Sequence, residues 1–193
     1  MRYTRNHIPK QAFNDSIMKT LGIVYWPKKG SVELNAKRIH KEWGEETADL
    51  ISLRDIEPEE LLNYSCLIFG CSTVGADSWR DAYTGNSWNR FFLRMNRAKI
   101  DLKGRKVALF GLGDQILYRE HYVDEMARIS SELKAHGAVI VGRWPAEGYE
   151  HTDSKALKDG YFLGLALDEH NQEEKSMERI HAWIQDLKKN HFF

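Results

Sequence analysis

The segment that most constrains this chain is an apolar run, residues 107–111, which ends in a glycine-rich turn carrying Asp114 and Gln115. A short, uninterrupted apolar run is typical of a strand buried on both faces, as strands in parallel sheets are. Polar residues that directly follow such a strand lie at the carboxyl edge of the sheet, where open α/β folds bind their ligands. The segment therefore predicts a doubly wound α/β fold with a ligand site at this edge.

Apolar runs alternate with helix-like patterns along the chain, which is typical of strand–helix–strand units. Five strands are expected, at residues 21–25, 49–53, 66–71, 107–111 and 138–141. A helix is expected to begin at residues 57–60. Three apolar stripes predict further helices: Val32, Ala36, Ile39 and Trp43; Val123, Met126, Ser130 and Leu133, ended by Gly137; and Met177, Ile180, Ile184 and Leu187. The pattern therefore predicts a parallel sheet joined by helical crossovers.

Two stretches do not fit a minimal five-stranded sheet. Residues 76–99 are rich in aromatic side chains, which are expected to pack, and in arginines at helical spacing, which are expected to form an exposed face. Residues 152–172 interrupt the region of the fifth strand, and residues 161–167 within them are expected to form an extra hairpin. Both stretches are expected to be insertions.

Size and charge exclude several classes of protein. With 193 residues, the chain is expected to form one domain at residues 19–193, preceded by a polar extension at residues 1–18. The formal net charge of zero argues against binding to nucleic acid or to a membrane surface. No apolar stretch approaches the roughly 20 residues that span a bilayer, and the amino terminus lacks the apolar core of a secretory signal. We expect a cytoplasmic protein, and a monomer.

The cysteines and histidines give no sign of a metal site. Cys66 and Cys71 lie five positions apart on one expected strand, so their side chains point to opposite faces and are expected to stay reduced. The eight histidines are scattered without metal-ligand spacing, and no serine has the context of an acyl-transfer nucleophile. The sequence therefore predicts neither a metal site nor a catalytic residue.

From residue 21 to residue 188 the chain resembles the long-chain flavodoxins. The likeness is carried by residues 104–115, by Trp-Pro-Ala-Glu-Gly-Tyr at residues 144–149, and by residues 154–157 and 162–169, which resemble the long-chain insertion. Several separated motifs in the family's order are more specific than one glycine pattern. The resemblance implies a flavodoxin-like, three-layer, doubly wound α/β sheet of five parallel strands in the family's order 2-1-3-4-5. It also implies helices on both faces and an insertion in the last strand region.

The resemblance further implies an electron-transfer flavoprotein rather than an enzyme with its own substrate. Such proteins hold FMN noncovalently and carry single electrons between redox partner proteins, a reductase and an acceptor, while the protein tunes the flavin's potential. Tyr118 matches the tyrosine that stacks on the flavin, and Gly75 can allow a peptide flip beside it. The cofactor-binding residues implied are Lys28, Lys29, Gly30, Ser31, Val32, Ser72, Thr73, Val74, Gly75, Trp79, Gly111, Leu112, Gly113, Asp114, Gln115, Tyr118 and His121.

The loop after the first strand departs from the family. Where the family's phosphate loop carries hydroxyl side chains, this chain has Pro27, Lys29 and Val32, and proline also removes a backbone donor. The helix that follows still favours an anion at its amino terminus. Lys28 and Lys29 either neutralise the phosphate by charge or are merely solvated.

The surroundings of the expected flavin depart from the family as well. Val74 stands where a tryptophan often stacks, and Trp79 or Tyr83 can substitute for it. The family is strongly acidic around the flavin edge, whereas this chain is neutral. Residues 76–99 hold five basic side chains, Arg80, Arg90, Arg94, Arg97 and Lys99, against Asp77 and Asp81.

Two alternative functions stay open. The altered loop and the basic stretch fit a flavodoxin-like protein that no longer binds flavin and serves as an interaction or regulatory module. A flavin-dependent reductase acting on a small substrate ranks lower, because most flavodoxins do not act on nicotinamide donors directly.

Overall fold

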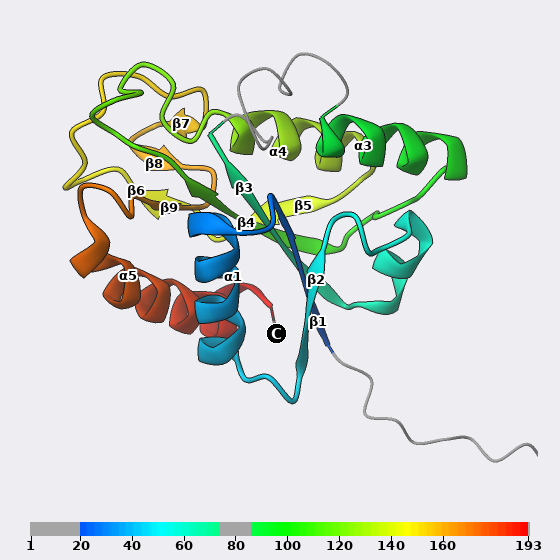
Figure 1. The fold of residues 1–193 in the computed structure, drawn as a ribbon. Coiled ribbons are helices and arrows are strands. Elements are labelled where there is room, and N and C mark those ends of the chain that lie inside the picture. The colour runs from blue at the N-terminus through cyan, green and yellow to red at the C-terminus, as the bar shows by residue number, and fades with distance from the viewer. Residues whose placement is uncertain (1–19, 74–85, 193) are drawn as a thin grey trace, which may run out of the picture.

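A parallel sheet with the strand order β2-β1-β3-β4-β5 runs through the centre of the molecule (Figure 1). The computed structural model describes residues 20–73 and 86–192. The strands are β1 (Leu21–Trp26), β2 (Ala48–Ser52), β3 (Cys66–Ser72), β4 (Lys106–Leu112) and β5 (Val139–Val141). The flavodoxin-like order implied by the resemblance is confirmed, and the strand bounds differ from the predicted ones by one residue at most.

The last strand of the sheet is divided into two pieces by an insertion. β5 pairs with the first half of β4, and β9 (Leu165–Leu167) pairs with its second half, also in parallel. Between them lies a small antiparallel sheet of β6 (Trp144–Pro145), β8 (Tyr161–Phe162) and β7 (Leu157–Lys158). The predicted hairpin at residues 161–167 is wrong in its placement. The hairpin is β7–β8, and residues 165–167 join the main sheet, because their apolar side chains are fully buried beside β4.

Helices cover both faces of the sheet (Figure 1). On one face, α1 (Gly30–Trp43) contacts α5 (Glu173–Asp186), which continues into the π-helical turn η2 (Leu187–His191). The other face carries α3 (Ser87–Ala98), α4 (Glu125–Ala135) and the 3-10 helix η1 (Pro58–Asn63). None of the helices in the described part of the chain has the length and apolar character needed to cross a membrane.

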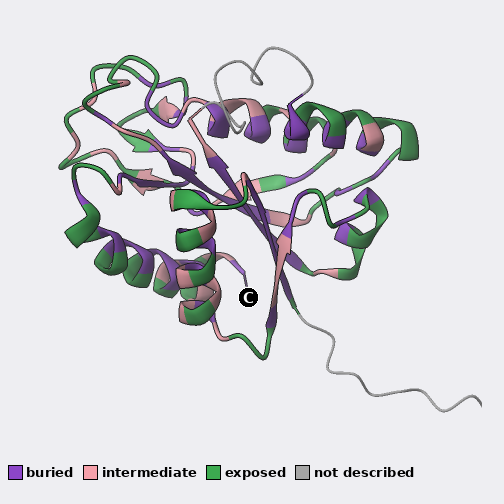
Figure 2. Ribbon diagram, viewed as in Figure 1, coloured by how far each residue is buried: buried purple, intermediate pink, exposed green. Residues whose placement is uncertain are grey.

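Strand residues alternate between two apolar cores, and the central strands β1, β3 and β4 are buried along most of their length (Figure 2). Phe69 and Leu109 pack with α3 and α4, whereas Ile68 and Ala108 pack with α1 and α5. Cys71 belongs to the first core and Cys66 to the second, and both thiols are free, as expected for opposite faces of one strand.

The interpretation of residues 76–99 as an insertion is wrong for residues 87–98. These residues form α3, the crossover helix that a parallel connection from β3 to β4 requires. The aromatic side chains Trp88, Phe91 and Phe92 are at most 2% exposed, so the packing expected for them is confirmed.

The predicted stripe of the last helix is wrong at its first position. Met177 is 47% exposed, because the buried face of α5 runs through Ser176, Ile180 and Trp183 instead. The α4 stripe is buried at all four predicted positions, but its first member, Val123, precedes the helix with a φ of 50°.

Gly164 lies between β8 and β9, where the chain passes close to β4. A Cβ atom at this position would lie 2.1 Å from the Leu109 carbonyl oxygen. We therefore expect Gly164→Ala to lower the free energy of unfolding by about 3 kcal/mol. In the control Gly160→Ala, the added Cβ meets no atom within 4 Å, so only the backbone strain at a φ of 77° is expected, about 1–2 kcal/mol. Urea unfolding measures both free energies. Equal losses of stability in the two variants would contradict the steric overlap with the Leu109 carbonyl.

Candidate functional site

Three loops meet at the carboxyl edge of the sheet. Parallel register places Trp26 at the end of β1 opposite Cys71, and Ser72 at the end of β3 opposite Leu112. The loops that follow β1, β3 and β4 therefore start side by side, although they are far apart in the sequence. This edge is where the predicted site residues of the described chain gather.

The turn after β4 is organised by Asp114. Its carboxylate accepts hydrogen bonds from the backbone N–H groups of Ile116 at 3.0 Å and Leu117 at 2.8 Å, and from the Asn171 side chain at 2.9 Å. Burial acts to raise the pKa of Asp114, but these donors outweigh it and hold the pKa below its usual value. The backbone N–H of Tyr118 closes the turn on the Asp114 carbonyl at 3.0 Å.

The side chains beyond Asp114 face outward at the ligand edge. Ile116 is 50% exposed and Leu117 is 69% exposed, and Tyr118 next to them is half-buried. Exposed apolar side chains beside an aromatic ring form a surface suited to a flat apolar ligand. His121 is exposed, and its ring lies 3.1 Å from the Asp124 carboxylate.

Gln115, by contrast, turns into the protein. It is fully buried, and both its backbone N–H and its side-chain amide donate to the Asp168 carboxylate, at 3.0 Å and 2.9 Å. Its side-chain oxygen accepts the backbone N–H of Glu150 at 2.5 Å. The Gln115 side chain therefore connects the turn to the insertion. Only the backbone of Gln115 is available for the expected ligand contact.

Asp168 is a residue of the site that the sequence analysis missed. It directly follows β9, is fully buried, and also accepts the backbone N–H groups of His170 and Asn171 at 3.0 Å each. The signal that could have found it is the one that marked Asp114, an aspartate placed directly after an apolar strand.

The loop after β3 is tied to the turn after β4. Thr73 donates its hydroxyl to the Leu112 carbonyl at 3.2 Å, and its own carbonyl accepts the N–H of Glu125 at 3.2 Å. A Cβ atom at Gly113 would lie 2.8 Å from the Thr73 hydroxyl oxygen, so this close approach requires glycine. The predicted contacts at Val74, Gly75 and Trp79 lie outside the described residues.

The loop after β1 holds its lysines in different ways. The Lys28 ammonium group pairs with Asp55 at 2.5 Å, so its charge is partly neutralised within the protein. Lys29 adopts a φ of 68°, a region that favours glycine, and its backbone N–H donates to the Glu33 carboxylate at 2.6 Å. A Cβ atom at Gly30 would meet no other atom within 4 Å, so the start of α1 is open there.

Glu33 brings a negative charge to the amino terminus of α1. Its hydrogen bond from Lys37 and that from the Lys29 backbone lower its pKa, so it remains ionised near neutral pH. Burial raises the pKa of Tyr25 to about 12, and the nearby Glu33 charge adds to the shift. Val32, which was expected to contact a ligand, directs its side chain into the core, because only 3% of the residue is exposed.

Comparison with known proteins gives one consistent family. The family model described as Flavodoxin matches residues 23–183. The flavodoxin of Synechocystis sp. is 36% identical over 172 residues, covering 89% of this chain and 97% of the relative. Flavodoxin 1 of Azotobacter vinelandii is 34% identical over 169 residues, covering 86% and 94%. The solved structure of Fusobacterium nucleatum flavodoxin bound to flavin mononucleotide is 26% identical, with a TM-score of 0.77, and the match covers 89% and 98% of the two chains.

Removing the Asp168 carboxylate should loosen the turn after β4. Asp168→Ala leaves several buried donors without their acceptor, so we expect a loss of about 3 kcal/mol in the free energy of unfolding. Asp168→Asn retains one acceptor oxygen and should lose less. The amide protons of residues 114–118 should exchange faster in Asp168→Ala, as measured by hydrogen exchange. The exposed control Glu147→Ala should change stability by less than about 0.5 kcal/mol. Unchanged exchange in Asp168→Ala would show that the turn holds without the carboxylate.

Proposed function

Because this chain belongs to the long-chain flavodoxin family, we propose that it binds FMN noncovalently at the carboxyl edge of its sheet. There it carries single electrons between redox partner proteins. The observation that carries this proposal is the turn after β4. Its backbone is fixed by the carboxylates of Asp114 and Asp168, and it presents Ile116, Leu117 and Tyr118 at the ligand edge. A tyrosine ring beside apolar side chains matches the flat, largely apolar isoalloxazine ring.

The phosphate end of FMN fits the start of α1. The first backbone N–H groups of a helix have no partner within it and favour an anion, and Gly30 leaves open space in front of them. The backbone of Gly30, Ser31 and Val32 and the charge of Lys29 would hold the phosphate there. The Glu33 carboxylate would lie beside the phosphate, because it accepts the Lys29 backbone N–H at the same end of the helix.

The chain's own residues would orient the cofactor and limit its contact with water. Tyr118 would cover one side of the ring, while the backbone from Gly111 to Gln115 would contact the ring and the ribityl chain. Bound FMN supplies the one-electron chemistry. The Fusobacterium nucleatum relative, solved with flavin mononucleotide, supports the same cofactor here.

Further features of the proposal follow from the family and the thiols. We expect a protein without a small-molecule substrate of its own, which works with a reductase and an acceptor protein. The two free, buried thiols suit a reducing compartment such as the cytoplasm. Within residues 20–73 and 86–192, no observation favours the flavin-free module or the flavin-dependent reductase.

Titration of the apo protein with FMN, followed by flavin fluorescence, tests the function directly. We expect strong quenching, because Tyr118 would stack on the ring, and riboflavin should bind at least about tenfold more weakly, because it lacks the phosphate. Tyr118→Ala should reduce quenching by both flavins. An absence of quenching with either flavin would contradict the proposal.

The carboxylate of Glu33 should oppose the phosphate. We expect Glu33→Gln to tighten FMN binding by about fivefold, the equivalent of about 1 kcal/mol, and to leave riboflavin binding unchanged. Because the folded-state pKa of Glu33 is lowered, its carboxylate stays charged near neutral pH. The phosphate of FMN is almost fully dianionic above about pH 7, so the ratio of the FMN dissociation constants of variant and wild type should be constant from about pH 7 to pH 8. The control is Glu46→Gln, an exposed glutamate after α1. Equal effects on FMN and riboflavin would place Glu33 outside the phosphate site.

A further inference from the structure

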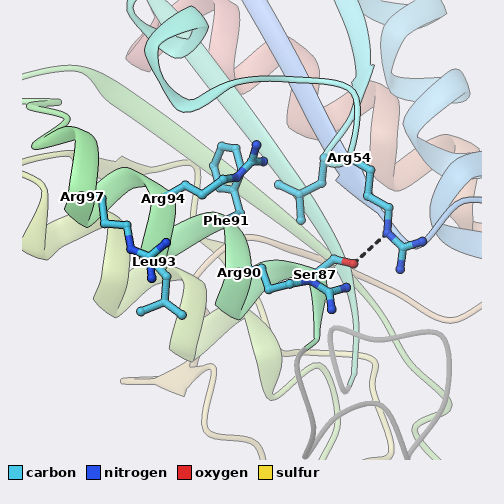
Figure 3. Close-up of a pocket in the computed structure, with 8 residues that line it drawn as sticks. Arg54, Ser87, Arg90, Phe91, Leu93, Arg94 and Arg97 are labelled. Atoms are coloured by element: carbon cyan, nitrogen blue, oxygen red, sulfur yellow. Dashed lines mark hydrogen bonds between the residues drawn. The ribbon is translucent and has the colours of Figure 1, made fainter.

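A groove of about 510 Å³ lies between the loop after β2 and helix α3 (Figure 3). Four of its eight lining residues are arginines, and none of the eight is acidic. The lining residues are Leu53, Arg54, Ser87, Arg90, Phe91, Leu93, Arg94 and Arg97. The groove is thus a cationic surface on a chain whose formal net charge is zero.

The charge of this groove is concentrated on α3. The helix has twelve residues, among them Arg90, Arg94 and Arg97, and no acidic residue. The three arginines are spaced four and three positions apart, so they share one face of the helix, where like charges repel one another. Arg90 also stands in the first turn, where the helix dipole favours acidic side chains. Helix stability therefore does not explain the position of Arg90, whereas Arg97 stands in the last turn, where the dipole favours a cation.

Two of the four guanidinium groups are fixed by contacts within the protein. Arg94 lies over the Phe91 ring at 5.4 Å and pairs with Glu57 at 2.7 Å. Arg54 lies over the Trp26 ring at 3.9 Å and donates to the Ser87 hydroxyl at 3.0 Å. Stacking of this kind holds a guanidinium plane in place and leaves part of its edge for further hydrogen bonds.

The other two arginines flank an exposed apolar side chain. Arg90 and Arg97 are exposed, and their guanidinium groups form no ion pair or hydrogen bond with any described residue. Leu93 lies between them along the helix and is 56% exposed. An apolar centre with cations on both sides is the arrangement of a protein-binding surface rather than of a site for a bare anion.

The groove adjoins the edge of the sheet where the cofactor is proposed to bind. Arg54 contacts Trp26, the last residue of β1, and its neighbour Asp55 pairs with Lys28 in the loop that follows. A protein docked in the groove would therefore reach the same edge as the flavin.

We infer that this groove docks an acidic segment of a redox partner protein, an inference that rests on the proposed electron-carrier function. Aspartate or glutamate side chains of the partner would pair with Arg90 and Arg97, and an apolar side chain would cover Leu93. Arginine suits this role because its planar group binds a carboxylate through two parallel hydrogen bonds. The charge of the surface selects acidic partners and speeds their association.

A rhodamine-labelled peptide, Gly-Glu-Asp-Phe-Glu-Asp-Leu-Glu amide, tests the groove by fluorescence anisotropy with the FMN-loaded protein. We expect Arg90→Glu with Arg97→Glu to weaken binding at least about tenfold, and Leu93→Ser to weaken it about threefold. The matched control, Lys175→Glu with Lys189→Glu, makes the same change in net charge at exposed positions in α5 and η2, and should stay within about twofold of wild type. Raising the salt concentration should weaken binding of the peptide to the wild-type protein.

Several outcomes would overturn the inference. One is a wild-type protein that does not bind the peptide. Another is an equal loss of peptide affinity in the groove variant and in the lysine control. A third is equal affinity for a peptide that carries Asn and Gln in place of its Asp and Glu residues. Competition by tripolyphosphate together with an unaffected Leu93→Ser variant would identify a small-anion site instead. FMN titration of the groove variant should match wild type, so a failure of docking is separable from a failure of cofactor binding.

Discussion

The parallel pairing of β3 with both β1 and β4 is the constraint from which the other features of this molecule follow. Strands paired in this way are buried on both faces, so their residues are almost entirely apolar and the polar chemistry moves to the strand ends. Because the strands run in one direction, three loops from distant parts of the sequence start at one edge. The position of the site is therefore set by the direction of the strands, and individual side chains only determine what it binds.

The turn after β4 depends on the insertion as well as on its own sequence. The insertion returns the chain to β4 as β9, and Asp168 at its end reaches Gln115, which lies 53 positions earlier. Asn171 connects the two aspartates, because its side chain donates to both Asp114 and Asp168. The insertion therefore fixes the turn that borders the proposed ligand site. The loop after β1 is held by one local contact, between Lys29 and Glu33, and by one distant contact, between Lys28 and Asp55.

The sequence predicted the strands, their order and the edge that carries the site, because these depend on short apolar runs and on motifs of a known family. It failed where the outcome depends on what a segment packs against. Residues 165–167 suit a hairpin or a buried strand equally well, and only the free half of β4 decides between them. Gln115 was placed correctly in the turn, but the direction of its side chain depends on Asp168. Similarly, Lys28 is paired by Asp55, a residue 27 positions away.

The division of the last strand also affects how this protein meets its neighbours. An unbroken strand at the border of a sheet offers a row of unpaired donors and acceptors to any other extended chain. Here β5 contributes only three residues to that border, and the chain then leaves the sheet through Gly142, with a φ of 72°, before β9 takes its place. Neither piece is long enough to act as a template for a further strand. The insertion therefore protects this border of the sheet from edge-to-edge association, a hazard that an undivided strand would carry at the same position.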